Sequence, residues 1–335
     1  MPENPIAADP RPSGAPWDFA GSGIVVTGAT GLYGRCLVGR LLAAGARLRT
    51  VSSRPPPPDF PLAAVDHRVG DLRDRCFADG VMAGMDAAFL LAGKRGSVGI
   101  QISRAATMLT DNLLVCYNSL DAACRAGVKR MVYASTVTVY PPMDVYREDL
   151  AWSAPPHPGD QYVAWAKRMA EKLIEAQQVQ YGRATTAVVR PVNTFGPHDN
   201  FDPATALVVP ALIGRALSGE NPLVVWGDGS AVRDFLFVSD AVDGLLLAFD
   251  KGIGQGAINL GSGRGHSIRE VVNAVVAATG FAGEVVWDSA KPAGEARKVA
   301  DTTRAREILG FAPKVDLGEA IRRTVDWYRT TRDRN

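Results

Sequence analysis

Apolar and polar residues alternate along the chain in blocks that predict strands and helices in turn. The first apolar block, residues 24–26, is short and β-branched, as expected for a central strand covered on both faces. A helix is predicted over residues 35–44, where Gly45 provides a C-terminal cap, and a second strand follows at residues 48–51. Together these residues form one strand–helix–strand unit of a parallel sheet.

The same alternation continues beyond this unit. Further strands are predicted at residues 65–69, 87–91, 128–134 and 186–189, a short helix at 72–78, and long helices at 103–126 and 160–180. After Arg190 the alternation loosens. A strand at 235–238 is expected to return to the sheet, and helices near 208–218, 267–279 and 317–331 are expected to form a smaller unit with short strands. The pattern predicts an α/β fold, a doubly wound parallel sheet of the Rossmann type with a smaller interleaved C-terminal α/β domain.

Three glycines, at 28, 31 and 34, lie between the first strand and the first helix. Without side chains they allow a sharp turn, and they allow a pyrophosphate to approach backbone N–H groups at the helix N-terminus. A glycine-rich turn without a ligand is the alternative, but the strand before it, the helix after it and the second strand favour dinucleotide binding. The residues expected to contact the cofactor here are Gly28, Thr30, Gly31, Leu32, Tyr33 and Gly34.

Two domains and a tail are therefore expected. Residues 1–20 are rich in Pro, Ala and Gly and are predicted to be a flexible tail, held at Trp17 and Phe19. Residues 21–192 plus 234–261 are predicted to form the dinucleotide-binding Rossmann domain, and residues 193–233 plus 262–335 the smaller domain.

Composition and charge narrow the class of protein. The chain has 335 residues, 47% hydrophobic and 21% charged, which suits a globular protein with a sizeable core. A formal net charge of +2 indicates neither a nucleic-acid nor a membrane surface, and no apolar run is long enough to span a bilayer. Histidines are scattered without metal-ligand spacing, so no metal site is predicted. The cysteines form no C-x-x-C pair and are expected to be buried free thiols in a reducing cytoplasm: Cys36, Cys76, Cys116 and Cys124.

The G-x-x-G-x-x-G spacing at residues 28–34, together with the segment Thr27-Gly28-Ala29-Thr30-Gly31, resembles the short-chain dehydrogenase/reductase superfamily. The likeness is greatest to the extended branch that acts on nucleotide sugars. Residues 190–197 resemble the R-P-x-N-x-[FY]-G-P segment of that branch. The segments 198–201, 224–227, 232–235, 259–263 and 289–292 continue the likeness to GDP-L-fucose synthases. The resemblance covers residues 22–330 and implies that the smaller domain binds a nucleotide sugar.

The end of the second strand discriminates between the two nicotinamide dinucleotides. An acidic residue there accepts hydrogen bonds from a ribose 2′-OH, whereas an arginine attracts a 2′-phosphate. This chain has no acidic residue at that point but has Ser53 and Arg54. We therefore expect NADP(H) in preference to NAD, the alternative being that Arg54 is a solvated loop residue.

The resemblance implies further contacts with the cofactor. Asp71 and Leu72 are expected beside the adenine ring, although Asp71 is also a candidate N-cap for the helix at 72–78. The small residues at the end of the fourth strand suit a close approach of the cofactor. The remaining implied contacts are Leu91, Ala92, Gly93, Lys167 and Pro191.

Catalysis in the superfamily uses a tyrosine and a lysine on successive turns of one helix, with a Ser or Thr after the fifth strand. Lys167 is the lysine, and Thr136 occupies the Ser/Thr position, with Thr138 as a second hydroxyl. Four residues before Lys167 stands Val163, and Tyr162 is five before. In a regular helix a spacing of five places two side chains roughly 140° apart. Either the helix begins irregularly and Tyr162 reaches the site, or the usual acid/base is missing.

The resemblance also implies a substrate site with Arg233 as the diphosphate clamp, since a guanidinium matches phosphate oxygens. Each charge alone has the alternative of a solvated surface position. The implied substrate contacts are Asn193, Val209, Trp226, Arg233, Lys291 and Arg297.

Departures from the family limit the chemistry. Thr138 and Leu207 stand where GDP-L-fucose synthases keep the Cys and His that epimerise C3 and C5. Sugar 4,6-dehydratases need an Asp-Glu pair where this chain has Val137 and Thr138. The remaining expectation is a nucleotide-sugar 4-epimerase or 4-ketoreductase. The alternatives are a redox-neutral elimination or isomerisation, and a catalytically silent dinucleotide sensor.

The expected partners are a GDP- or UDP-linked sugar and a second copy of the chain. The resemblance implies that the helices 103–126 and 160–181 pair with their copies in a four-helix bundle of a homodimer. No nucleic acid and no membrane partner is expected.

Overall fold

The computed structural model describes residues 17–94, 96, 98–203, 205–291 and 295–332. Its centre is a seven-stranded sheet in the order β11-β7-β5-β4-β1-β2-β3, with every neighbouring pair parallel. Along the chain the strands are β1 Gly23–Thr27, β2 Arg47–Ser52, β3 Asp66–Val69, β4 Ala87–Leu90, β5 Arg130–Ala134, β7 Thr186–Pro191 and β11 Ala257–Leu260. The expected doubly wound α/β fold is thereby confirmed.

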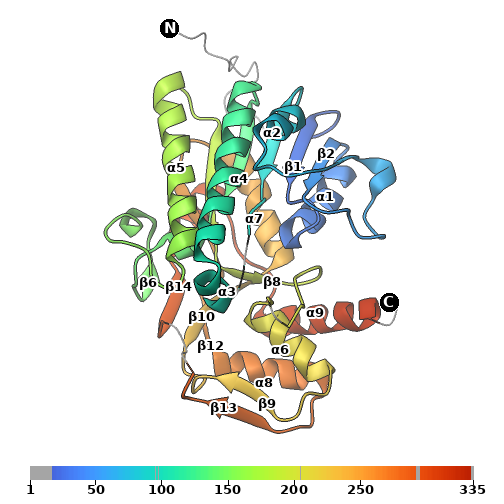
Figure 1. The fold of residues 1–335 in the computed structure, drawn as a ribbon, viewed down its shortest axis with the longest axis vertical. Helices are drawn as coiled ribbons and strands as arrows, with labels where there is room; N and C mark the ends of the chain where they lie inside the picture. The colour runs from blue at the N-terminus through green and yellow to red at the C-terminus, as the bar shows by residue number, and fades with distance from the viewer. Residues whose placement is uncertain (1–16, 95, 97, 204, 292–294, 333–335) are drawn as a thin grey trace.

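Helices cover both faces of this sheet (Figure 1). One face carries α1 Leu32–Ala43 and α7 Val238–Lys251, and the other carries α2 Arg75–Met82, α4 Ala105–Arg125 and α5 Gln161–Tyr181. Within β1, Ile24 and Val26 belong to the core on the first face, and Val25 to the core on the second. Their burial on opposite sides explains why this strand is apolar at consecutive positions.

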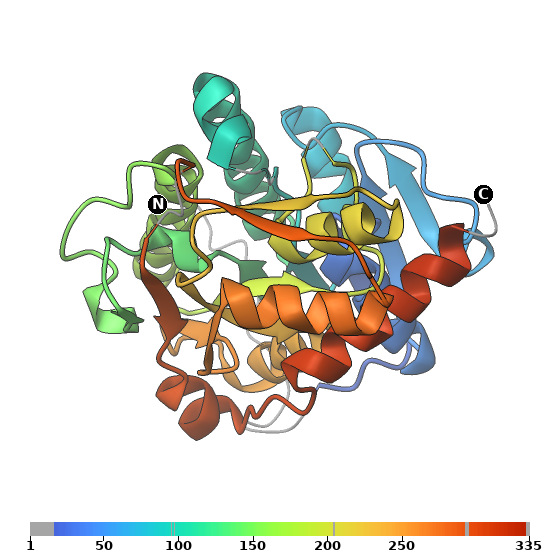
Figure 2. The same cartoon turned by 90° about the horizontal axis from the view of Figure 1, so that it is seen from below.

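A second group of elements lies below the main sheet in Figure 1, at the carboxyl end of its strands. A second sheet has the order β12-β10-β14-β6, with β8 beside β10, and a two-stranded ribbon joins β9 to β13. Seen from below, α8 and α9 lie side by side across this region (Figure 2). The elements are β6 Val145–Tyr146, β8 Asn193–Phe195, α6 Val208–Leu217, β9 Leu223–Trp226, β10 Val232–Phe237, β12 Gly265–Ser267, α8 Ile268–Thr279, β13 Val285–Asp288, β14 Arg297–Ala300 and α9 Leu317–Arg332.

Two features of this topology differ from the sequence prediction. The strand expected at 235–238 does not return to the main sheet, because β10 pairs with β8, β12 and β14. The seventh strand of the main sheet is β11 instead, and the helix between these strands, α7, was not predicted as a separate element.

The helix expected at 72–78 begins later, as α2 at Arg75. Its N-cap is Asp74, whose carboxylate accepts the backbone N–H groups of Cys76 at 2.8 Å and Phe77 at 3.3 Å. Asp71 is therefore not the cap, because Asp74 lies closer to the first turn. A short helix, α3 Val98–Ser103, also precedes α4.

The edge strand β3 is short and charged. Arg49 on β2 donates to Asp66 at 2.9 Å, and Arg68 donates to the same carboxylate at 2.7 Å. These exposed ion pairs contribute little to the free energy of folding. They place charged side chains along the edge strand of the sheet.

The tail prediction lies mostly outside the described residues, since residues 1–16 are not described. Within the described part, the rings of Trp17 and Phe19 each lie 5.4 Å from the ring of Phe249 on α7. Phe89 on β4 stacks on the same ring at 5.0 Å. Phe249 therefore joins the first described residues to the core. Across the described ranges, no helix has the length and apolar character needed to cross a membrane.

We expect Phe249→Ala to lower the free energy of unfolding by about 3–5 kcal/mol, because it empties a fully buried aromatic site. Urea denaturation followed by circular dichroism measures this change. The matched control is Val179→Ala on α5, where the side chain is 80% exposed; this change is expected to stay within about 0.5 kcal/mol. A loss below about 1 kcal/mol for Phe249→Ala would contradict the packing described.

Candidate active site

The turn between β1 and α1 brings backbone segments into close contact. Gly28 adopts φ +67°, and a Cβ on it would lie 3.1 Å from the backbone of Ala92. A Cβ on Gly34 would lie 2.3 Å from the carbonyl oxygen of Gly28. Only glycine therefore fits at 34, and the left-handed conformation at 28 favours glycine. The result is a tight cradle between the ends of β1 and β4.

The N-terminus of α1 opens from this cradle. Gly31 is the N-cap and is exposed, and it provides no side-chain cap for the first turn of the helix. Leu32 is buried in the core, while Thr30 and Tyr33 are half-buried. Exposed N–H groups at a helix N-terminus attract phosphate oxygens, and this arrangement suits a pyrophosphate.

Thr27 is a residue that the sequence analysis did not select. Its Oγ1 accepts the backbone N–H groups of Leu91 at 3.0 Å and Ala92 at 3.2 Å. This bridge fixes the end of β4 against the end of β1, where the glycine cradle begins. A threonine within an apolar strand that is buried on both faces was the available sequence signal.

The end of β2 presents Ser53 and Arg54 to solvent, both exposed, whereas Ser52 is buried. No acidic side chain follows directly, because residues 55–58 are prolines. The arrangement leaves one guanidinium and one hydroxyl at the position where a 2′-phosphate is expected.

Asp71 lies after β3, but its carboxylate is engaged by Arg73 at 2.5 Å, and this hydrogen bond holds the pKa of Asp71 below its usual range. Arg73 also donates to the buried Asp111 at 2.6 Å. Asn118 on α4 donates to the carbonyls of Leu72 and Arg73. The loop is thus held against α4, with Asp71 on its exposed side.

Lys167 is buried, with 7% of its surface exposed, although it carries a charge. Its Nζ donates to the carbonyl oxygen of Ala134 at 2.8 Å and lies 4.8 Å from the centre of the Tyr133 ring. A Cβ on Gly93 would lie 3.5 Å from this Nζ and 3.1 Å from the Oδ1 of Asn112. The structure therefore brings Gly93, Lys167 and Asn112 together at the ends of β4 and β5.

The helix that carries Lys167 is regular from its first turn. Asp160 is the N-cap of α5, and its carbonyl accepts the N–H of Ala164 at 3.1 Å. Tyr162 is 37% exposed, and Val163 occupies the half-buried position one turn before Lys167. With regular geometry, Tyr162 and Lys167 lie on different faces of the helix.

Thr136 and Thr138 form a hydroxyl pair just after β5. The Oγ1 of Thr136 accepts the backbone N–H of Thr138 at 3.2 Å and lies 3.3 Å from its hydroxyl. Both residues are half-buried, two and four positions beyond the carbonyl that holds Lys167. Thr136 is the N-cap of a short turn, Val137–Val139, so both threonines lie just beyond the carboxyl end of β5.

A buried polar chain supports this region. Glu171, one turn after Lys167, accepts Ser135 Oγ at 2.5 Å and pairs with Arg190 at 2.7 Å. Arg190 donates to the hydroxyl of Tyr140 at 2.8 Å. Burial raises the pKa of Tyr140, which keeps the phenol neutral. The sequence analysis used Arg190 only as a motif residue and did not identify this chain, because its members are far apart in sequence.

The expected substrate residues fall into two groups. Asn193 and Arg233 lie on the paired strands β8 and β10, and Arg297 lies on β14 beside them. Trp226 is 61% exposed on the β9–β13 ribbon, and the Nζ of Lys291 lies 5.9 Å from its ring. Val209 is fully buried in the core, and Pro191 is buried at the end of β7.

Beside Arg233 lies an ion-paired cluster. His157, Asp160 and Glu295 place potential metal ligands within 4.8 Å of one another. However, Lys298 Nζ lies 3.1 Å from Asp160 and 2.6 Å from Glu295. This ammonium group forms ion pairs with both carboxylates, so we interpret the cluster as an ion-pair network.

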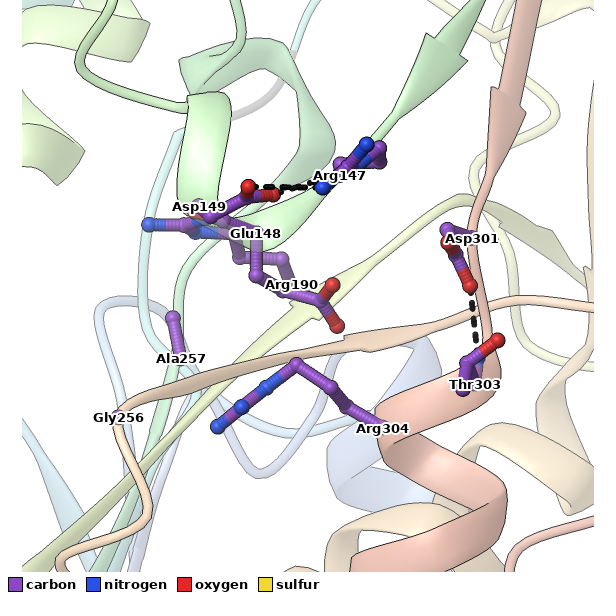
Figure 3. A pocket seen from close by; sticks show the side chains of 9 residues that line it. All are labelled: Arg147, Glu148, Asp149, Arg190, Gly256, Ala257, Asp301, Thr303 and Arg304. Carbon is purple, nitrogen blue, oxygen red and sulfur yellow. Dashed lines mark hydrogen bonds and ion pairs between the residues drawn. The ribbon is translucent and has the colours of Figure 1, made fainter.

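A cavity of about 450 Å³ lies at the outer edge of the main sheet (Figure 3). Burial raises the pKa of Glu148 at this cavity. The cavity includes Arg190 but no residue that the sequence analysis assigned to cofactor or substrate. It is lined by Arg147, Glu148, Asp149, Arg190, Gly256, Ala257, Asp301, Thr303 and Arg304.

Comparison with known proteins identifies the family. The protein-family model described as "NAD dependent epimerase/dehydratase family" matches residues 24–261. The chain belongs to the NAD-dependent epimerase/dehydratase family. It is accordingly an NAD(P)-dependent enzyme, as expected from the glycine turn.

Members of the family resemble the chain over most of its length. "Probable GDP-L-fucose synthase 1" of Oryza sativa subsp. japonica is 35% identical over 71% of this chain and 74% of its own. The "dTDP-4-dehydro-6-deoxy-D-allose reductase" of Streptomyces bikiniensis is 29% identical over 93% of this chain and 97% of its own. The crystal structure of a GDP-L-fucose synthetase from Naegleria fowleri bound to NADP matches with a TM-score of 0.82 and 25% identity. The match covers 95% of this chain and 96% of that protein.

The residues present fit a nicotinamide dinucleotide of the kind this epimerase/dehydratase family uses. The cradle at Gly28 and Gly34 admits no side chain, and Gly31 leaves the N-terminus of α1 open. Lys167 lies beside Gly93 and would supply a cation to the ribose of such a cofactor. When bound, the dinucleotide supplies or accepts a hydride.

Gly34→Ala is expected to weaken NADPH binding at least about tenfold, because the new methyl displaces the Gly28 carbonyl and distorts the cradle. Titration of NADPH fluorescence on the purified protein measures the Kd. The matched control is Gly39→Ala on the same helix, where a Cβ meets nothing within 4 Å. This control should leave the Kd unchanged and stabilise the helix by about 0.4–1 kcal/mol. Equal Kd values for the two variants would argue against pyrophosphate binding at this turn.

Proposed function

We propose that the enzyme reduces a 4-keto nucleoside diphosphate sugar, GDP- or UDP-linked, with NADPH, or epimerises such a sugar at C4 by the same hydride transfer. The observation that carries this proposal is the buried Lys167, which lies beside Gly93 and donates to the carbonyl of Ala134. Ala134 ends β5, and the hydroxyl pair of Thr136 and Thr138 follows two residues later. Such a site combines a cation for the ribose with hydroxyls for a sugar oxygen.

The relatives support this class of substrate. One is named as a GDP-L-fucose synthase and another as a dTDP-4-dehydro-6-deoxy-D-allose reductase. Arg233, on the strand beside Asn193, has its pKa lowered by burial. A partly buried guanidinium suits a diphosphate, since the guanidinium fork matches two phosphate oxygens. Trp226, Lys291 and Arg297 are the outer contacts in this proposal, and Val209 supports the site from the core.

The choice of NADP(H) rests on the end of β2. Ser53 and Arg54 are exposed there, and the chain has no carboxylate to bond a free 2′-OH. Asp71 and Leu72 border the adenine in this proposal, and Leu91, Ala92 and Pro191 border the remainder of the cofactor. A dissociable NADPH favours the reductase over the epimerase.

Each residue of the site has a distinct role in the reduction. Lys167 binds the nicotinamide ribose and places positive charge near the carbonyl oxygen that gains negative charge. Thr136 donates a hydrogen bond to that oxygen, and Thr138 orients Thr136. The oxygen then gains a proton, which a tyrosine delivers in this superfamily. In this chain the proton comes from water, or from Tyr162 if substrate binding moves the start of α5. Thr138 and Leu207 also replace the Cys and His of the bifunctional synthases, so no epimerisation at C3 or C5 is proposed.

A second candidate function follows from Val163. Because α5 is regular, the half-buried position one turn before Lys167 holds an apolar side chain, not a phenol. An enzyme without that proton donor suits a redox-neutral elimination or isomerisation with a retained dinucleotide, or a silent dinucleotide sensor. Tyr162 serves as proton donor only if substrate binding moves the start of the helix.

The deciding experiment identifies the nucleotide that is released when the purified protein is denatured. Mass spectrometry should find no stoichiometric NAD(H), and added NADPH should be oxidised at 340 nm with 4-keto nucleotide sugars. Stoichiometric NAD(H) and unchanged absorbance during turnover would favour the epimerase or the redox-neutral reaction. Bound dinucleotide without turnover on any nucleotide sugar would favour the sensor.

Val163→Tyr is expected to raise kcat at least about tenfold, because it restores a phenol on the face of Lys167. Tyr162→Phe is the matched control and should leave kcat within about twofold. Lys167→Ala is expected to lower kcat/KM about 100-fold or more. Steady-state assays with NADPH measure all three. A loss of activity in Tyr162→Phe alone would show that Tyr162 reaches the substrate.

The proposal includes a homodimer through α4 and α5, which lie side by side (Figure 1). Both helices carry exposed apolar side chains. Exposed apolar patches of this kind mark association sites. The exposed side chains are Leu113, Leu114, Tyr117, Trp165 and Met169.

We also propose a reducing cytoplasm as its location, since all four cysteines are free. The expectation of buried thiols is correct for Cys116 and Cys124, but Cys36 is half-buried and Cys76 is exposed. The proposed domains are residues 21–192 plus 234–261 and residues 193–233 plus 262–335. The boundary at 233/234 falls within β10, so this strand joins the two domains.

Met169 is 51% exposed in the single chain and would be covered in the proposed dimer. Met169→Glu is therefore expected to convert the dimer to a monomer, because the new carboxylate would be buried against apolar side chains of the second copy. Light scattering after size exclusion gives the mass. Glu175→Lys, an exposed charge change on the same helix, is the control and should leave the dimer intact. A monomeric parent protein would remove this part of the proposal.

A further inference from the structure

A histidine on β3 is hydrogen-bonded to the end of β2. In the parallel register His67 lies opposite Thr50, one strand from the position expected to meet the cofactor ribose. Its Nδ1 lies 2.8 Å from the hydroxyl of Thr50, and its Nε2 lies 3.0 Å from the hydroxyl of Ser52. The two hydroxyls are buried, so the imidazole links the last residues of β2.

The hydrogen bonds fix how this imidazole is protonated. The hydroxyl of Ser52 donates its only proton to the carbonyl oxygen of Arg54 at 2.6 Å. Its oxygen must therefore accept a hydrogen bond from Nε2–H of His67. The unprotonated Nδ1 then accepts a hydrogen bond from the hydroxyl of Thr50. Burial lowers the pKa of His67, in agreement with a neutral ring. A chain of hydrogen bonds thus runs from Thr50 through His67 and Ser52 to the backbone carbonyl of Arg54.

The same ring also holds the other end of the loop. After Arg54 come four prolines, and the ring of Phe60 packs edge-on against His67 with centroids 5.2 Å apart. Phe60 is 4% exposed and belongs to the core. The loop 53–59 thus begins at a hydrogen bond to His67 and ends at a ring contact with it.

Two further constraints limit the motion of this loop. A residue before proline is restricted to extended backbone, which applies to Arg54 before Pro55. Asp59 pairs with Arg35 on α1 at 2.5 Å. With both ends and one side attached, the loop presents the exposed side chains of Ser53 and Arg54 in a defined place. Preorganised groups bind a ligand without losing their freedom at that moment.

We propose that His67 is a positioning residue that selects dinucleotides with a 2′-phosphate by holding loop 53–59, and with it Ser53 and Arg54, in the phosphate-binding arrangement. This inference rests on the NADP(H) preference in the proposed function. His67 itself does not contact the cofactor. It acts through the hydroxyl of Ser52 and the backbone of Arg54.

The test compares two substitutions of the same histidine. His67→Gln keeps an N–H near the position of Nε2 and retains the bond to Ser52, whereas His67→Asn reaches only toward Thr50. Isothermal titration with NADPH and with NADH gives the Kd of each variant without any sugar substrate. His67→Asn is expected to weaken NADPH binding about fivefold to tenfold, with the Kd for NADH within about twofold. His67→Gln should retain most of the preference.

Control variants separate this effect from general electrostatics and from misfolding. Arg68→Ala removes a positive charge from the adjacent residue of β3, which pairs with Asp66, and should leave the preference unchanged. Thermal unfolding reports whether each variant folds. If His67→Asn does not fold, Ser52→Ala removes the next hydroxyl in the same chain of hydrogen bonds. It is expected to give the same loss of affinity for NADPH.

The outcomes distinguish the inference from the function on which it rests. A parent protein without NADPH preference overturns both. A parent that prefers NADPH and loses this preference in Arg54→Ala, but not in His67→Asn or Ser52→Ala, overturns the role of His67 and leaves the proposed function intact. Equal losses for NADPH and NADH in His67→Asn would show a merely structural role and likewise overturn it.

Discussion

The buried ion pair between Arg190 and Glu171 is the contact on which the geometry of the site depends. Their side chains are 3% and 8% exposed, and an unpaired charge in such a place costs several kcal/mol. The pair therefore holds α5 against the end of β7. Since Glu171 also accepts from Ser135 and follows Lys167 by one turn, the same contact aligns the helix with the end of β5.

This polar chain extends from the main sheet to the second sheet. Tyr140 receives a hydrogen bond from Arg190 and donates one to Asn259 on β11 at 2.7 Å. Asn259 in turn donates to the carbonyls of Tyr146 on β6 and of Asp301 just after β14. The elements proposed to hold the cofactor and those proposed to hold the sugar therefore share one hydrogen-bonded frame.

Features encoded by neighbouring residues could be predicted from the sequence. The glycine turn at 28–34 and the parallel strands were of this kind, because a few residues determine each of them. The membership of β10 in the second sheet could not be predicted, since its partners β12 and β14 lie far along the chain. Asp71 and Asp74 give the same local signal for a helix cap, and only the structure shows that Arg73 engages the first. The support of Lys167 by Glu171 and Arg190 likewise depends on tertiary contacts.

The two edges of the main sheet are closed in different ways. At β11, the carboxylate of Glu148 accepts the backbone N–H of Asn259 at 3.0 Å, so a side chain occupies a position that another strand would need. At β3, the strand is only four residues long and carries Asp66 and Arg68. Short, charged or occupied edges prevent strands of other molecules from adding to a sheet. These two edges of the main sheet are therefore closed to added strands, which leaves helical surfaces for the dimer proposed above.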